Sequence, residues 1–179
     1  SAYKAIKEKN IESTIVQTVP MMWSCKKIVK KNKYLDKFTI LHASTCKLMH
    51  TRPWAYEDTF EFILNLNKII SVINKIPNTL LLIRIRPHYE LSKKTLIKNL
   101  IVSDNYIIKT SGNFEDDILN SDFMISYSST TIEEALHYGR PVGLLGVSSR
   151  YRHFPESISS NKIRKAIYHL NHKDLQDDL

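Results

Sequence analysis

A run of hydroxyl side chains is the clearest chemical feature of this sequence. Residues 126–131 contain five Ser or Thr residues and one Tyr, and the chain then continues into helix-forming sequence. The start of a helix presents backbone N–H groups that lack helical partners, so hydroxyls at this point can help to bind a phosphate. The same residues can instead cap the helix, with Glu133 or Glu134 in its first turn. The local sequence leaves both interpretations open.

A second polar element, Arg86-Pro87-His88, directly follows the most apolar segment of the chain. That segment, residues 79–85 (TLLLIRI), is typical of a strand buried in a parallel sheet. Arginine has a planar fork of donors that suits phosphate, and histidine can donate to an oxygen or titrate near neutral pH. We therefore treat Arg86 and His88 as candidate anion ligands.

Strand-like and helix-like segments alternate around these polar elements. Short apolar runs predict strands, and apolar residues at helical spacing predict helices. The predicted strands are 38–43, 79–85, 106–109, 123–126 and 142–147, and the predicted helices are 57–75, 91–100, 114–120, 130–138 and one around 161–170. This order predicts an α/β fold, a doubly wound, Rossmann-like parallel sheet of five or more strands with helices on both faces. Ligands of such sheets bind at the carboxyl ends of the strands, where the strand order reverses.

The chain divides into an N-terminal appendage or linker, residues 1–37, and a Rossmann-like domain, residues 38–179. Residues 26–37 hold six lysines and one acidic residue, and the whole chain has a net charge of +8. Such a charge favours an anionic partner, and the lysine run suits peripheral contact with an anionic membrane. A solvated basic surface is the alternative interpretation.

Several other kinds of chemistry lack their sequence patterns. The sequence has no GxGxxG, Walker A, HExxH or GxSxG motif. Its histidines have no carboxylate or cysteine partners at metal-ligand spacing, so this pattern does not indicate a metal site. No nucleic-acid recognition motif is present, and residues 151–154 are predicted to flank the binding loops. Two widely spaced cysteines and no apolar run of transmembrane length favour a cytoplasmic protein, with the inner face of the membrane as the alternative location.

Residues 121–146 (SDFMISYSSTTIEEALHYGRPVGLLG) resemble the donor-binding motif of GT-B glycosyltransferases. In that family a strand ends in a loop of small residues, and the next helix has a glutamate five residues before a glycine that precedes a proline. Here these residues are Glu134, Gly139 and Pro141. The resemblance implies that Glu134 holds the ribose hydroxyls of the donor nucleotide and that Thr130 and Thr131 contact its diphosphate.

Other segments extend the resemblance. Ser128 and Ser129 stand where many members have a glycine pair, which is similar to the capsule, teichoic-acid and surface-polysaccharide branches of the family. Residues 80–90 resemble an arginine–proline–histidine element of those branches, which implies that Arg86 and His88 face the donor phosphates. Residues 110–123 resemble the loop that borders the base. The remaining implied contacts are Gly112, Asn113 and Phe114 to the base and Thr45 to the pyrophosphate.

The resemblance implies the C-terminal, donor-binding half of a glycosyltransferase or polyol-phosphate transferase in surface polysaccharide biosynthesis. Its donor is a nucleotide-activated sugar, and it needs no metal or other cofactor. The family's general base comes from an N-terminal acceptor domain, which this chain lacks, so we expect the isolated chain to bind donor without turnover. A nucleotide-sugar epimerase of the same fold and a non-catalytic nucleotide- or glycan-binding module are the alternatives.

Overall fold

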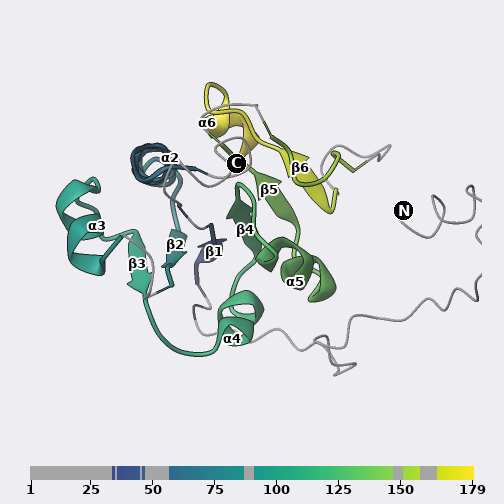
Figure 1. The fold of residues 1–179 in the computed structure, drawn as a ribbon, viewed down its shortest axis with the longest axis horizontal. Coiled ribbons are helices and arrows are strands. Elements are labelled where there is room, and N and C mark those ends of the chain that lie inside the picture. Colours follow the sequence, from purple (N-terminus) through teal and green to yellow (C-terminus); the bar gives the residue numbers. More distant parts are fainter. Residues whose placement is uncertain are drawn as a thin grey trace, which may run out of the picture.

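Six parallel strands form one sheet in the computed structural model, which describes residues 34, 36–44, 46, 57–86, 91–146, 151–157 and 165–179. Across the sheet the strands stand in the order β3-β2-β1-β4-β5-β6, so the strand order reverses between β1 and β4 (Figure 1). The strands are β1 (Phe38–His42), β2 (Thr79–Arg84), β3 (Tyr106–Lys109), β4 (Phe123–Ser126), β5 (Val142–Leu144) and β6 (Ile167–His169). The predicted doubly wound parallel sheet is confirmed.

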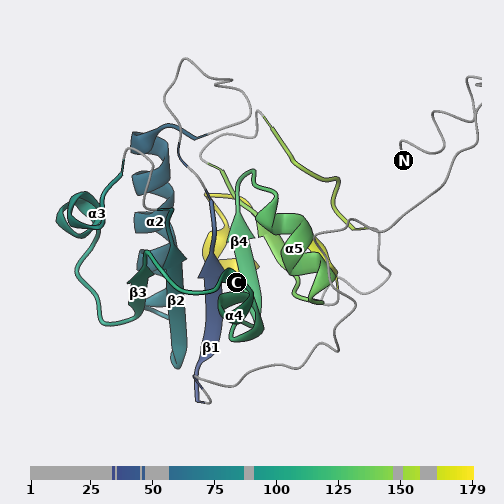
Figure 2. The same ribbon diagram turned by 60° about the horizontal axis from the view of Figure 1, so that its bottom comes forward.

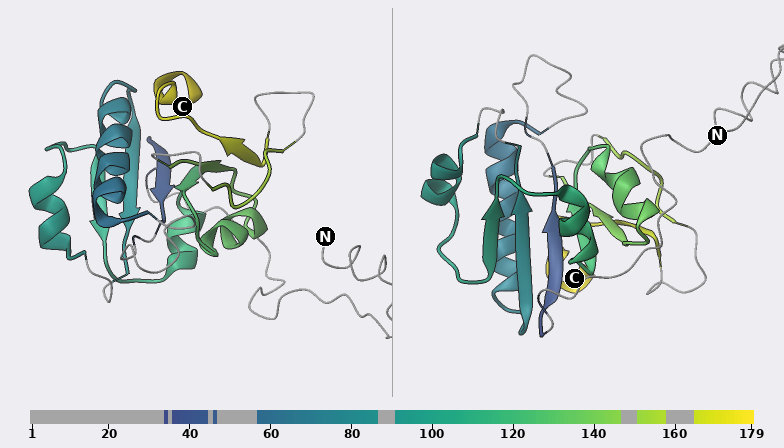
Figure 3. Two further views of the ribbon diagram at one scale, coloured as in Figure 1. Left: turned by 45° about the horizontal axis from the view of Figure 1, so that its top comes forward. Right: turned by 90° about the horizontal axis from the view of Figure 1, so that it is seen from below.

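Helices cover both faces of this sheet, as predicted. They are α2 (Thr59–Ile73), α3 (Lys93–Asn99), α4 (Phe114–Leu119), α5 (Thr131–His137) and α6 (Leu175–Asp178). Figures 2 and 3 show α2 on one side of the strands and α4 and α5 on the other. The side chains divide in the same way, because one buried cluster joins α2, α3 and α6 to the sheet and a second joins α4 and α5 to it.

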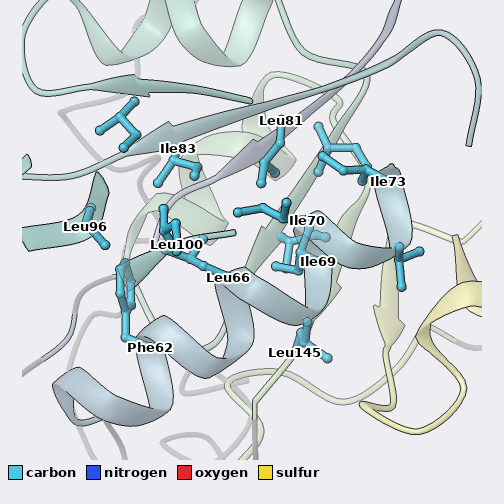
Figure 4. Close-up of a cluster of buried hydrophobic side chains, with 14 of the residues drawn as sticks. Phe62, Leu66, Ile69, Ile70, Ile73, Leu81, Ile83, Leu96, Leu100 and Leu145 are labelled. Carbon is cyan, nitrogen blue, oxygen red and sulfur yellow. The ribbon is translucent and has the colours of Figure 1, made fainter. Parts of the chain in front are cut away.

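Helix α2 supplies most of the large side chains on its face of the sheet. Its start is fixed by a capping box, in which Asp58 accepts from the backbone of Glu61 and the Glu61 side chain accepts from the backbone of Asp58. Its buried side chains recur at helical spacing and pack toward Leu81 and Ile83 of β2 (Figure 4). They include Phe62, Leu66, Ile69, Ile70 and Ile73. Full burial of each such side chain stabilises the fold by roughly 1.5–3 kcal/mol.

The end of α5 sets the path of the chain into β5. Gly139 has φ +66°, a left-handed conformation that glycine adopts at little cost at the end of a helix. Its N–H donates to Leu136 O at 3.0 Å, and the Arg140 N–H donates to Ala135 O at 2.9 Å. This pair of bonds is a Schellman motif, which satisfies carbonyl groups at the helix end.

The helix predicted around residues 161–170 is wrong. Residues 167–169 instead form β6, which pairs with β5 in parallel register, with Val142 opposite Ile167. The open edge of β5 offers backbone hydrogen bonds that a local pattern cannot reveal, and Leu170 then packs closely over Gly143. Strand β5 ends at Leu144, within the predicted segment 142–147.

The predicted appendage, residues 1–37, lies outside the described residues apart from Tyr34, Asp36 and Lys37. Most of the basic run at 26–37 therefore belongs to this undescribed part. Among the helices of the described chain, none is both long and apolar enough to cross a membrane.

His42 makes the stability of the fold depend on pH. The ring is 2% exposed and packs edge-on against Phe62, and its Nδ1 has no hydrogen-bond partner among the described residues. Burial lowers the pKa of His42 to about 4, whereas an unfolded histidine titrates near 6.5. Above pH 6.5 both states are neutral. As the pH falls toward 4 the unfolded state takes up a proton first, so the folded state loses about 3 kcal/mol.

We therefore expect the free energy of unfolding, measured by urea denaturation from pH 7.5 to 4.5, to fall less steeply in His42→Leu than in the wild type. His137→Leu is the control, because this side chain is only half-buried on α5. An equally steep fall in His42→Leu would show that burial of His42 is not the cause.

Candidate functional site

A pocket opens at the carboxyl ends of the strands, beside the point where the strand order reverses. Its lining comes from the residues after β1, the end of β2, the start of α4 and the β4–α5 connection. The lining residues are Ala43, Ser44, Arg84, Arg86, Phe114, Ser129, Thr131 and Glu134. Its volume of about 170 Å³ is below the roughly 300–1,000 Å³ of most small-molecule pockets. The described residues therefore enclose only part of a ligand of that size.

Hydroxyl groups join the end of β1 to the β4–α5 loop beneath this pocket. Both Ser126 Oγ and Thr131 Oγ1 donate to the carbonyl oxygen of Ala43, each at 3.0 Å. The Ser44 hydroxyl accepts from the Tyr127 N–H at 2.7 Å and lies 3.2 Å from Ser126 Oγ. Two of the hydroxyls in the 126–131 run thus hold the loop in place. Because the Thr131 proton goes to Ala43, direct donation from Thr131 to a phosphate would require that bond to break.

The side chain of the N-cap residue does not cap the start of α5. Thr130 is the N-cap residue, but its side chain makes no capping hydrogen bond and is exposed. The Ser129 hydroxyl instead accepts from the Thr131 N–H at 3.3 Å and also lines the pocket. Capping therefore accounts for at most one hydroxyl of the run.

Opposite charges face the pocket from two elements. Glu134 projects from the first turn of α5, and Arg86 follows β2. Burial raises the pKa of the Glu134 carboxyl, the positive charge of Arg86 lowers it, and the neighbouring Glu133 raises it. The guanidinium of Arg86 forms no hydrogen bond or ion pair with another described side chain. The pocket thus offers a cation for an anionic group and a carboxylate that can accept from hydroxyls.

The other glutamate of α5 turns away from this pair. Glu133 Oε1 lies 3.1 Å from His153 Nε2, and His153 Nδ1 lies 3.4 Å from the hydroxyl of Ser128. Ser128 is 8% exposed and is held in this chain of contacts rather than along the pocket wall. The sequence analysis placed His153 only in a segment that flanks the binding loops. Its pairing with Glu133 could not be predicted from local sequence, because the two residues are 20 positions apart.

The β3–α4 turn brings one of its three predicted base contacts to the pocket. Phe114 lines the wall, whereas the Asn113 side chain caps α4 by accepting from the Glu115 N–H at 3.1 Å. Gly112 has φ +94°, and its carbonyl accepts from Arg84 Nη2 at 2.7 Å. Gly112 and Asn113 therefore shape the turn that presents Phe114.

Arg84 was not among the predicted site residues, but it lines the pocket from the end of β2. Its Nη1 lies 3.1 Å from Asp117, a carboxylate that is 1% exposed and also pairs with Lys109. Asp117 is thus a buried ion-pair partner of two cations. Arg84 is the one charged residue in the apolar run TLLLIRI, and this feature could have marked it as a site residue.

Two predicted ligands, His88 and Thr45, lie outside the described residues. Among the residues that the structure does describe, no group of three or more His, Cys, Asp or Glu side chains could hold a metal ion.

No protein-family model matches this sequence, and no curated protein matches it. Solved structures do. The chain is similar to an S. aureus MnaA–UDP co-structure, with 21% identity and a TM-score of 0.47 over 63% of this chain and 29% of the other. It is also similar to a putative UDP-N-acetylglucosamine 2-epimerase from Listeria monocytogenes, with 16% identity and a TM-score of 0.47 over 63% of this chain and 28% of the other.

A third similar structure is the glycotransferase of kitacinnamycin, with 15% identity and a TM-score of 0.42 over 72% of this chain and 29% of the other. This chain thus spans less than a third of the length of each of these proteins.

The shared acceptor at Ala43 can be tested with neighbouring threonines. Thr131→Val removes a buried hydrogen bond, so we expect the free energy of unfolding in urea to fall by about 1 kcal/mol. Thr130→Val is the matched control, because this exposed side chain makes no capping bond, and its effect should stay within about 0.5 kcal/mol. Equal losses in the two variants would contradict a specific role for Thr131.

Proposed function

We propose that this chain binds a nucleotide-activated sugar and forms the donor-binding half of a glycosyltransferase in surface polysaccharide biosynthesis. The observation that carries this proposal is that Arg86 and Glu134 face one pocket at the point where the strand order reverses. Open α/β sheets bind their ligands at such points. A nucleotide-activated polyol phosphate has the same diphosphate and ribose and would use the same contacts.

The charges of the pocket suit the two ends of a ribose diphosphate. Arg86 would pair with the diphosphate through its planar fork of donors. Glu134 would accept hydrogen bonds from the ribose hydroxyls, and the ring of Phe114 offers an apolar wall to the base. Ser129 also lines the pocket and could donate to the same ligand. In this proposal His88, Thr45, Ser128 and Thr130 remain candidate donor contacts.

The chemical contribution of this site would be electrostatic. In sugar transfer an acceptor oxygen attacks the sugar carbon, and the bond from that carbon to the diphosphate breaks. Arg86 would stabilise the negative charge that builds on the departing diphosphate. We place the general base on the acceptor domain that the sequence resemblance implies, so this chain alone would bind donor without turnover.

The location of the protein is part of the same proposal. Nucleotide-activated sugars are cytoplasmic compounds, and the lysines of residues 26–37 would let the enzyme contact the anionic inner face of a membrane. Such contact would bring the donor site close to a membrane-bound acceptor.

A nucleotide-sugar epimerase is the second candidate. Epimerases of this fold also place a pair of glutamates near the donor, and Glu133 and Glu134 are adjacent here. Glu133, however, pairs with His153, which leaves Glu134 as the carboxylate on the pocket lining. Incubation of the chain with UDP-N-acetylglucosamine, followed by proton NMR, separates the two functions. Inversion at the sugar C2 would establish the epimerase, whereas binding without conversion supports the transferase half. A non-catalytic module would also bind without conversion, so sugar transfer after addition of an acceptor domain distinguishes these two.

The donor site predicts a specific effect of Glu134→Gln. The change keeps the shape of the side chain and removes its charge, which weakens hydrogen bonds worth about 1.5–3 kcal/mol. Isothermal titration with UDP, CDP, GDP and ADP should show an affinity that falls by about ten- to a hundredfold for the nucleotide that binds best. The affinity for inorganic pyrophosphate, which lacks ribose, should stay unchanged.

Glu133→Gln provides the matched control, since its carboxylate faces His153, and it should leave nucleotide affinity near the wild-type value. The proposal fails if the wild-type chain binds none of the four nucleotides at millimolar concentration. It also fails if Glu134→Gln lowers stability and leaves affinity unchanged.

A further inference from the structure

Helix α4 is held by one arginine near each end. At its C-terminal end, Arg140 donates from Nε to Ile118 O at 3.2 Å and from Nη2 to Leu119 O at 3.4 Å. At its N-terminal end, Arg84 binds the turn that leads into the helix and a carboxylate on the helix itself. Arg84 lines the pocket and Arg140 does not. Both arginines thus hold an end of α4, but only Arg84 does so beside the pocket.

The guanidinium of Arg84 is largely committed to the protein. Nη1 donates to Ser111 O and to Asp117 Oδ2, and Nη2 donates to Gly112 O. Three of its five N–H groups therefore have protein acceptors. The Arg84 side chain is 16% exposed, and its carboxylate partner Asp117 is 1% exposed and also pairs with Lys109. These contacts make Arg84 poorly suited to serve as the main phosphate ligand.

What Arg84 holds is the turn before Phe114. Its planar fork fixes two consecutive carbonyl groups and a carboxylate, an arrangement that the single ammonium of a lysine cannot reproduce. The turn also depends on the left-handed conformation of Gly112 at φ +94°. Two residues later the chain reaches Phe114 on the pocket wall. The position of this ring relative to β2 is therefore set by the Arg84 contacts.

We propose that Arg84 is a positioning residue that fixes Phe114 and thereby controls how tightly the pocket holds the base of a nucleoside diphosphate. This inference rests on the proposed donor-binding function and adds to it separate roles for the two arginines. Arg86 binds the diphosphate, whereas Arg84 acts on the base through the 111–114 turn. Loss of the fork should therefore weaken binding of ligands that carry a base and spare ligands that do not.

The experiment compares Arg84→Lys with Arg140→Lys in the full chain. Each variant is titrated with UDP, CDP, GDP and ADP and with inorganic pyrophosphate, and its thermal stability is recorded. In Arg84→Lys we expect the Kd of the nucleotide that binds best to rise about tenfold, which is within the range of a lost base–aromatic contact. The Kd of pyrophosphate should change by less than about twofold. Arg140→Lys should leave both Kd values near those of the wild type.

Three results would overturn the inference and leave the donor site intact. They are parallel losses for nucleotide and pyrophosphate in Arg84→Lys, no loss for either ligand, and a base-selective loss in Arg140→Lys. If Arg84→Lys does not fold, Gly112→Ala tests the same turn, because an alanine at φ +94° strains it while Arg84 remains. That variant should show the same base-selective loss, and unchanged nucleotide affinity would contradict the inference. A wild-type chain that binds pyrophosphate but no nucleotide would overturn the inference and the donor site together.

Discussion

The carbonyl oxygen of Ala43 accepts hydrogen bonds from two hydroxyls that lie more than 80 residues further along the chain. This shared acceptor joins the end of β1 to the β4–α5 connection. The strand order of the sheet reverses at this point, between β1 and β4. The connections after β1 and β4 lead to helices on different faces, and these bonds tie Ala43 to both ends of the β4–α5 connection. With them, α5 starts at a fixed distance from β1, and Glu134 in its first turn faces the pocket. The candidate site therefore depends on hydroxyl groups that have already donated to the protein.

Neighbouring residues of the same type have different tasks in this site. Arg84 and Arg86 both line the pocket, but Arg84 is bound to Asp117 and to two carbonyls, whereas Arg86 remains beside Glu134. Glu133 and Glu134 diverge because consecutive helical residues point about 100° apart. One therefore pairs with His153 while the other stays on the pocket lining. The bound member of each pair shapes the site, and the other member lines the pocket without such a partner.

The two faces of the sheet contribute differently to stability and to the site. Helix α2 has 15 residues and buries a row of large aliphatic side chains. Helices α4 and α5 have six and seven residues, which is too short for a helix to be stable in water without tertiary contacts. They are held by capping, by the Schellman motif at Gly139 and by arginine side chains. The pocket thus borders two short helices that are fixed by specific polar contacts as well as by their own buried apolar cluster.

The local sequence by itself determined most of the strands and helices. Apolar runs predicted five strands, among them 106–109 and 123–126 with their observed bounds, and helical spacing predicted a helix over 130–138, where α5 lies. These features follow from side-chain periodicity and backbone conformation, which act over a few residues. Tertiary structure decided the rest. Residues 167–169 became a strand because β5 offered an open edge. Hydroxyls of the 126–131 run contact either Ala43 or His153, both far away in the chain, or line the pocket. Arg84 belonged to the pocket only because β2 lies beside the turn before α4, and a contact between positions 28 residues apart has no local pattern.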